Sequence, residues 1–206
     1  GLQIQKKMLP KIRKTVCHYL FEHRVKPSLY LSGDFLDYFN LDAHRCLFYF
    51  ADVSGHGASS AFATVLLKNL SMRLKRNLKR GSSDHLSDPS KFLQRVNHEL
   101  ITTDLGKHAT VFVGVLDNRT NELSYSIAGH FPFPIMTVNG EAEYLEGKGM
   151  AVGLLPNPEF KVYTKTLLPG FKIVVLSDGI LEVLPEMSLN DKEKLLLDVV
   201  SKHGDG

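Results

Sequence analysis

Hydrophobic and polar positions show two kinds of pattern along this chain of 206 residues, and each pattern predicts one kind of secondary structure. Apolar side chains recur at every fourth position over Ala58–Lys79, which predicts a long helix. Gly81 is expected to end it, and a second helix is expected to begin at its cap, Asp88, and to run to about Thr103. A third helix is expected over Asn190–Lys202. The expected buried stripe of the first helix is Phe62, Leu66, Leu70, Leu74 and Leu78.

Short apolar runs bounded by turn residues predict strands in the rest of the chain. Turns at Asn118–Asn121, Asn139-Gly140 and Pro169-Gly170 are expected to join the last six strands into three hairpins. Strands followed by two central helices and then by more strands predict two sheets with helices packed against them. The expected strands lie at about Val16–Phe21, Pro27–Ser32, Cys46–Asp52, His108–Asp117, Glu122–Ala128, Pro134–Val138, Glu141–Leu145, Phe160–Leu168 and Phe171–Leu176.

Composition narrows the class of protein. Apolar residues make up 43% of the chain and charged residues 23%, the balance of a soluble globular domain. The net charge of +3 is too small to predict a nucleic-acid partner, and no apolar run is long enough to predict membrane insertion. Cys17 and Cys46 form no CxxC pair, and the first residues show no signal-peptide pattern. We therefore expect a cytoplasmic protein with neither a disulfide framework nor a zinc site.

Three aspartates stand out by their position. Asp52 directly follows an apolar strand, Asp178 follows the run Phe171–Leu176, and Asp34 lies in the segment SGDFLD. If the two apolar strands are neighbours, their carboxylates meet at one edge of the sheet, where their repulsion favours a bound cation. Magnesium or manganese, which prefer oxygen ligands, suit such a site. Each aspartate taken alone also fits an ordinary turn, the commoner role of an Asp-Gly pair.

A glycine-bounded turn, ADVSGHG (51–57), joins the strand of Asp52 to the long helix. Gly55 and Gly57 allow the backbone to approach a phosphate, and the helix directs its positive end there. His56, between these glycines, fits either a phosphate-binding role or a polar turn.

Four segments in order resemble the SpoIIE/RsbU family of metal-dependent (PPM, type 2C) serine/threonine protein phosphatases. They are GDFLD (33–37), ADVSGHGASSA (51–61), SIAGHFPFPI (126–135) and LSDGILEV (176–183). The resemblance implies an α+β fold, a four-layer αββα sandwich of two antiparallel sheets flanked by helices. It also implies dephosphorylation of a partner signalling protein, often an anti-sigma-factor antagonist.

The resemblance further implies a role for each matching residue. Asp34, Asp52 and Asp178 are the expected catalytic residues. The expected metal ligands are the same three aspartates and the backbone carbonyl of Val53, around two Mn²⁺ or Mg²⁺ ions whose bridging hydroxide attacks phosphorus. Gly55, His56 and Gly57 are the expected substrate-binding residues. No role follows for His130, which also fits a structural turn.

The ends of the chain carry further expectations. The family places another metal-binding aspartate before a final strand, and no such stretch occurs in this sequence. The phosphatase domain is therefore expected over residues 11–206, without its C-terminal strand. Residues 1–10 resemble the end of a linker helix, which predicts an upstream sensor or receiver domain and a homodimer through that helix.

Two other functions compete with an active phosphatase. A pseudophosphatase or adaptor would bind a regulatory partner without turnover, and the missing aspartate keeps this alternative open. A glycoside hydrolase would also use paired carboxylates, but the chain has no tryptophan for a sugar platform. The three retained aspartates favour the phosphatase.

Overall fold

The computed structural model describes residues 7–25, 33–55, 57–81 and 84–203. The strand predicted over residues 27–32, His56 and most of the predicted linker helix lie outside these ranges, although Lys7 and Met8 are helical. No helix in the described ranges is both long enough and apolar enough to cross a membrane.

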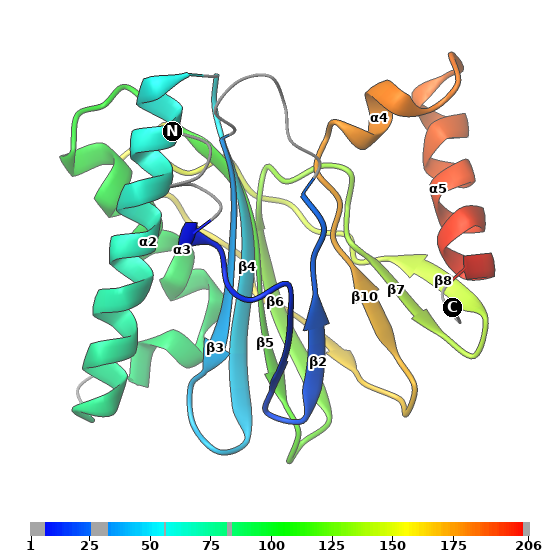
Figure 1. Cartoon of the computed structure of the whole chain (residues 1–206), viewed down its shortest axis with the longest axis horizontal. Coiled ribbons are helices and arrows are strands. Elements are labelled where there is room, and N and C mark those ends of the chain that lie inside the picture. The colour runs from blue at the N-terminus through cyan, green and yellow to red at the C-terminus, as the bar shows by residue number, and fades with distance from the viewer. Residues whose placement is uncertain (1–6, 26–32, 56, 82–83, 204–206) are drawn as a thin grey trace.

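The described chain forms four layers (Figure 1). Two helices, α2 and α3, cover one sheet, a second sheet packs on its other face, and α5 with the short α4 lies beyond the second sheet. This arrangement confirms the predicted α+β sandwich and the three predicted helices, and a 3-10 turn at Asp84–Ser87 leads into α3. The helices are α2 (Ala58–Lys79), α3 (Pro89–Thr102), α4 (Ile180–Val183) and α5 (Leu189–His203).

The larger sheet has five antiparallel strands in the order β3-β4-β5-β6-β9. Its central strands confirm the predicted strands that begin near Cys46, His108 and Glu122. Both faces of this sheet are covered, which explains why β4 and β5 are apolar almost without interruption. The strands are β3 (Asp34–Asn40), β4 (Arg45–Val53), β5 (Ala109–Asp117), β6 (Glu122–Ala128) and β9 (Tyr163–Thr166).

The smaller sheet has three strands in the order β10-β7-β8. Strands β7 and β8 form the predicted hairpin, and Asn139 and Gly140 reverse the chain with φ of 51° and 79°. Both angles lie in the left-handed region, as a two-residue hairpin turn requires. The strands are β7 (Ile135–Val138), β8 (Glu141–Tyr144) and β10 (Lys172–Val174).

The predicted third hairpin is wrong. Strand β9 pairs with β6 in the larger sheet, whereas β10 pairs with β7 in the smaller sheet. Pro169-Gly170 therefore carries the chain from one sheet to the other. Turn residues predict that the chain changes direction, but they do not predict which sheet the strand before the turn and the strand after it will join.

The predicted strand over Val16–Phe21 is also wrong, because the chain reverses in its middle. Strand β1 (Arg13–Val16) pairs with β2 (Tyr19–Glu22) across a tight turn at Cys17 and His18. These two residues have φ of 46° and 69°. Neither is a glycine or an asparagine, so the usual sign of such a turn is missing from the sequence.

Two apolar cores lie on opposite faces of the larger sheet. One core lies between this sheet and the helices and includes Leu67, Leu70, Phe92 and Tyr49. The other lies between the two sheets and includes the side chains of Tyr38, Phe48, Phe112, Ile127 and Met136. The hairpin β1–β2 closes this second core, where Phe21 stacks on Tyr38 with ring centroids 4.7 Å apart.

The predicted buried stripe of α2 is only partly right. Leu70 and Leu74 are buried, but Phe62 is 53% exposed. Four residues advance about 400° around a helix, so a strict spacing of four drifts by about 40° at each step. The buried face therefore continues through smaller side chains, including Ser60, Ala63 and Thr64.

Candidate functional site

The centre of the candidate site is a pair of aspartates on adjacent strands. Asp34 begins β3, and Asp52 is the last residue but one of β4. The antiparallel register places the two residues directly opposite each other. Directly paired residues share one face of a sheet, with Cβ atoms about 4.5–5.5 Å apart. Leu36 and Tyr38, which alternate with Asp34 along β3, pack into the core between the sheets, so this shared face looks toward the smaller sheet.

Asp178 approaches the pair from the other sheet, near enough for its charge to act on Asp52. The residue follows β10 and lies in the turn before α4, where its carbonyl oxygen accepts a hydrogen bond of 2.9 Å from the Leu181 amide. The condition considered from the sequence, that the strands of Asp52 and Asp178 are neighbours, is not met, because β4 and β10 belong to different sheets. The three aspartates instead approach one another because the two sheets face each other.

The pKa of Asp52 is affected by the two other aspartates. Burial, and then the charges of Asp34 and Asp178, raise the pKa of the Asp52 carboxyl from 3.8 to about 7. Near neutral pH, ionised Asp52 therefore adds negative charge where negative charge already accumulates. A divalent cation bound at this position would relieve the repulsion.

The donor atoms suit a hard divalent cation. Carboxylate oxygens and a backbone carbonyl are the ligands that Mg²⁺ and Mn²⁺ prefer. Within the described ranges, no three His, Cys, Asp or Glu side chains are grouped closely enough to hold an ion by themselves. The paired carboxylates would therefore need the carbonyl of Val53, water or a closer approach of Asp178 to complete a coordination shell.

The backbone of Val53 is fixed against Gly33. Its amide donates a hydrogen bond of 3.1 Å to the Gly33 carbonyl, and its side chain is buried in the core under the helices. A Cβ atom on Gly33 would lie 2.2 Å from the Val53 carbonyl oxygen, so this approach requires glycine. The glycine that precedes Asp34 thereby positions the carbonyl that follows Asp52.

The turn after β4 has the backbone that its glycines predict. Gly55 and Gly57 have φ of 78° and 87°, and Gly57 is the N-cap of α2. The Ser60 hydroxyl donates to the Ser54 carbonyl over 3.0 Å, which ties the first turn of α2 to this segment. An exposed glycine backbone at a helix N-terminus is suited to an anion.

Two further residues were not among the predicted site residues: Lys107 contacts the turn after β4, and Asp37 lies on the opposite, helix-facing side of β3. The Lys107 ammonium donates a hydrogen bond of 3.1 Å to the Ser54 carbonyl. Asp37 is buried, and its carboxylate accepts a hydrogen bond of 2.9 Å from the Lys75 ammonium on α2. Lys107 could have been found from topology, because the start of β5 must lie opposite the end of β4 in an antiparallel pair.

His130 lies in the wall between this site and the core. Its ring contacts the rings of Phe50 and Phe112, which are paired on adjacent strands. Phe50 lies two residues before Asp52 on β4, and Phe112 lies two residues after Thr110 on β5. Within the described part of the chain, its Nε2 is a buried atom with no hydrogen-bond partner. Burial lowers the pKa of His130 to about 4, so the ring is neutral near pH 7.

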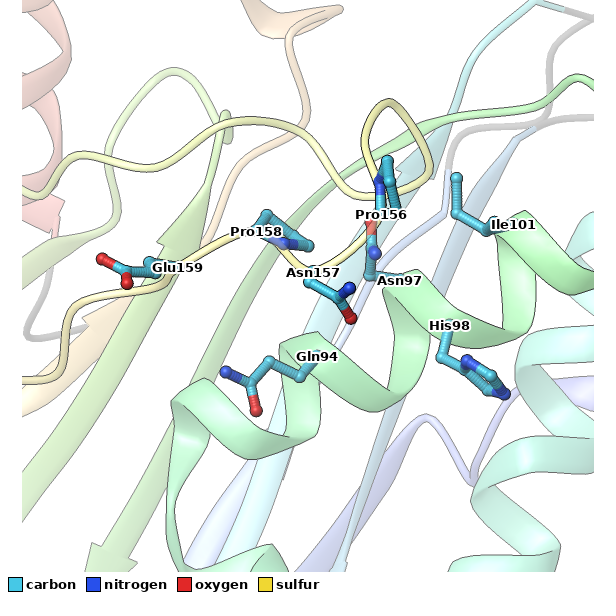
Figure 2. Close-up of a pocket in the computed structure, with 8 residues that line it drawn as sticks. All are labelled: Gln94, Asn97, His98, Ile101, Pro156, Asn157, Pro158 and Glu159. Atoms are coloured by element: carbon cyan, nitrogen blue, oxygen red, sulfur yellow. The ribbon is translucent and has the colours of Figure 1, made fainter.

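A separate hollow lies between α3 and the segment after Leu155 (Figure 2). It has a volume of about 280 Å³. Its buried polar side chain, Asn97, is satisfied, because it donates to the Leu155 carbonyl and accepts from the Gly153 amide. Its lining includes the single acidic residue Glu159, so a carboxylate cluster like that around Asp52 is not found there. The lining residues are Gln94, Asn97, His98, Ile101, Pro156, Asn157, Pro158 and Glu159.

Two facing antiparallel sheets between helical layers are the architecture of PP2C-type phosphatase folds. Solved structures of this class match the chain. The RsbU and RsbW domains of a Mycobacterium tuberculosis protein match with a TM-score of 0.67 and 26% identity, over 83% of this chain and 45% of that one. The SiaA-PP2C domain of Pseudomonas aeruginosa matches with a TM-score of 0.64 and 20% identity, over 82% of this chain and 66% of that one.

Within that class, the chain belongs to the SpoIIE family. Residues 42–206 match the family described as Stage II sporulation protein E. Protein IcfG of Synechocystis is 28% identical over 87% of this chain and 32% of its own length. The phosphoserine phosphatases RsbP and RsbU of Bacillus subtilis are 27% and 26% identical, over 74% and 82% of this chain and 37% and 48% of their own lengths. The chain thus spans about a third to a half of these relatives.

Proposed function

We propose that this chain is a metal-dependent serine/threonine protein phosphatase domain. The observation that carries the proposal is the direct pairing of Asp34 with Asp52. Burial and the charges of Asp34 and Asp178 raise the pKa of the Asp52 carboxyl to about 7. Relatives named as phosphoserine phosphatases, and a similar fold in RsbX solved in complex with magnesium at a TM-score of 0.55, support the same reading.

Each residue of the candidate site would have a distinct role. Asp34, Asp52 and Asp178, with the Val53 carbonyl, would hold two Mn²⁺ or Mg²⁺ ions. When bound, such a pair of ions makes water a nucleophile at neutral pH and stabilises charge on the phosphoryl oxygens. Gly55 and Gly57 would present backbone to the phosphate, and the buried neutral ring of His130 would help to exclude bulk water from the site.

The proposed substrate is a phosphoserine or phosphothreonine in a regulatory protein, such as an anti-sigma-factor antagonist. Support comes from the relatives RsbU and RsbP, and from the solved pairing of RsbU and RsbW domains in one chain. We further propose that residues 1–10 link the domain to an upstream sensor or to a second copy of the chain. The count of two ions depends on an additional aspartate that the family places near its C-terminus.

Asp52→Asn tests the assignment. We expect this variant to lose at least about a hundredfold of the Mn²⁺-dependent hydrolysis of p-nitrophenyl phosphate and of a phosphoserine peptide, while its circular dichroism spectrum stays unchanged. Asp104→Asn, which removes the same charge from an exposed turn, is the control and should keep full activity.

The adaptor alternative makes a different prediction. An adaptor would bind a regulatory partner, but neither the natural chain nor a longer one would release phosphate with Mn²⁺ or Mg²⁺. Full activity in a folded Asp52→Asn variant would refute the assignment of the site, even though it would support the phosphatase function over the adaptor.

A further inference from the structure

The ammonium group of Lys107 lies against the turn that follows β4. The residue directly precedes His108 and β5, whose Ala109 and Thr110 pair with Val53 and Asp52. The start of β5 therefore runs beside the end of β4 and the turn that follows it. The Lys107 ammonium lies 3.1 Å from the Ser54 carbonyl oxygen and 3.1 Å from the point where a Cβ on Gly55 would stand.

The backbone of Lys107 is held from the opposite side as well. Ala109 and Val152 exchange two hydrogen bonds of 2.9 Å, and these fix the segment around residue 152 beside the start of β5. A Cβ on Gly153 would lie 2.6 Å from the Lys107 carbonyl oxygen, so this segment packs directly against the lysine backbone. The side chain thus extends from a fixed backbone toward the turn, and little ordering is left to occur when an anion binds.

A positively charged side chain would offset the negative charge of this site. Asp34, Asp52 and Asp178 gather negative charge, and a phosphate dianion adds more. An ammonium group has three N–H donors, and the Ser54 carbonyl accepts one of them. A lysine is an effective point charge for phosphate.

From this geometry we propose that Lys107 is a phosphate-binding residue of the active site. It holds the Ser54–Gly55 segment through the Ser54 carbonyl and donates a second hydrogen bond to a phosphoryl oxygen of the substrate. The inference rests on the proposed phosphatase function for the identity of the anion. It adds a positively charged side chain to a site whose assigned metal-binding side chains are all acidic.

The test compares Lys107→Met, which keeps the apolar stem, with Lys107→Arg, which keeps the charge. Lys91→Met is the matched control, because Lys91 is an exposed lysine near the start of α3. Inorganic phosphate is titrated into each protein by calorimetry at fixed MgCl₂, and its inhibition constant is measured against p-nitrophenyl phosphate. Magnesium affinity is titrated separately, and circular dichroism shows that each variant is folded.

We expect Lys107→Met to weaken phosphate binding by about tenfold, which corresponds to about 1.4 kcal/mol. Lys107→Arg should stay within about threefold of the natural chain, and Lys91→Met should not differ from it. Magnesium affinity should change by less than about twofold in all three. Unchanged phosphate affinity in folded Lys107→Met would overturn the proposal.

Two other outcomes are also decisive. If Lys107→Met and Lys107→Arg both lose magnesium affinity and phosphate affinity together, Lys107 only holds the turn, and the phosphate-binding role is wrong. If phosphate binding depends on Lys107 but no protein, including the natural chain, turns over substrate, the phosphatase function fails while the anion site stands.

Discussion

Asp52→Asn should stabilise the metal-free protein, and the gain should grow with pH. The pKa of Asp52 rises from 3.8 to about 7 on folding, so the folded state binds the proton more tightly than the unfolded chain does. Between these two values the folded state holds more protons, and the free energy of unfolding therefore falls as pH rises. Asparagine does not titrate, so the variant escapes this loss.

The magnitude follows from the shift. About three pKa units at roughly 1.36 kcal/mol each set an upper limit near 4 kcal/mol above pH 7. Below the unfolded pKa the penalty vanishes, and at pH 5 it is still less than half of its full value. Because Asp52 is half-buried and partly screened by solvent, we expect the gain at pH 8 to exceed the gain at pH 5 by about 1–2 kcal/mol.

Urea denaturation in a chelating buffer at pH 5 and pH 8 measures both gains. The chain has no tryptophan, so far-ultraviolet circular dichroism is the suitable signal. Asp104→Asn, at an exposed position, should show no such pH-dependent gain. An equal effect of Asp52→Asn at both pH values would mean that the carboxylates do not repel one another and would refute the electrostatic basis of the site.

Two further substitutions test how the site is held. Gly33→Ala would place a carbon 2.2 Å from the Val53 carbonyl oxygen, so we expect at least tenfold weaker Mn²⁺ binding by calorimetry; unchanged affinity would show that this carbonyl is no ligand. Lys75→Met would remove the ammonium group that lies 2.9 Å from the carboxylate of buried Asp37. Urea denaturation should show that the free energy of unfolding falls by about 1–3 kcal/mol. The control Lys202→Met, which breaks an exposed ion pair, should lower it by less than about 0.5 kcal/mol. Equal losses in the two lysine variants would mean that the buried pair does not stabilise the packing of α2 on β3.

Local signals predicted the elements that local forces determine. The helix over residues 58–79 and the cap at Asp88 were predicted correctly, because helix ends depend on residues within one turn. The Asn139-Gly140 hairpin was predicted for the same reason, since its turn needs two residues with positive φ. The turn at Cys17 and His18 adopts similar angles without the usual residues, and the sequence therefore gave no sign of it.

Pairing between distant segments was harder to predict. Nothing near Pro169 says that β9 joins one sheet and β10 the other, because that choice depends on which sheet edges are open. The same limit applied to the site. The three aspartates could be named from their context, but the pairing of Asp34 with Asp52 is a matter of strand register, and the approach of Asp178 is a matter of two sheets facing each other.

The arrangement of the sheets explains why the candidate site lies where it does. Between the sheets the space is filled by aromatic and aliphatic side chains such as Phe48 and Phe112, and a charge there would lack solvent. Asp52 is two residues beyond Phe50 on the same face, at the end of β4, so its carboxyl is partly desolvated but still partly exposed. That position is dry enough to make repulsion among carboxylates strong and open enough for an ion and a phosphate to enter. The core that stabilises the fold thus supplies the low-dielectric wall that raises the pKa of Asp52, and the sheet end supplies the access that a cation-dependent reaction requires.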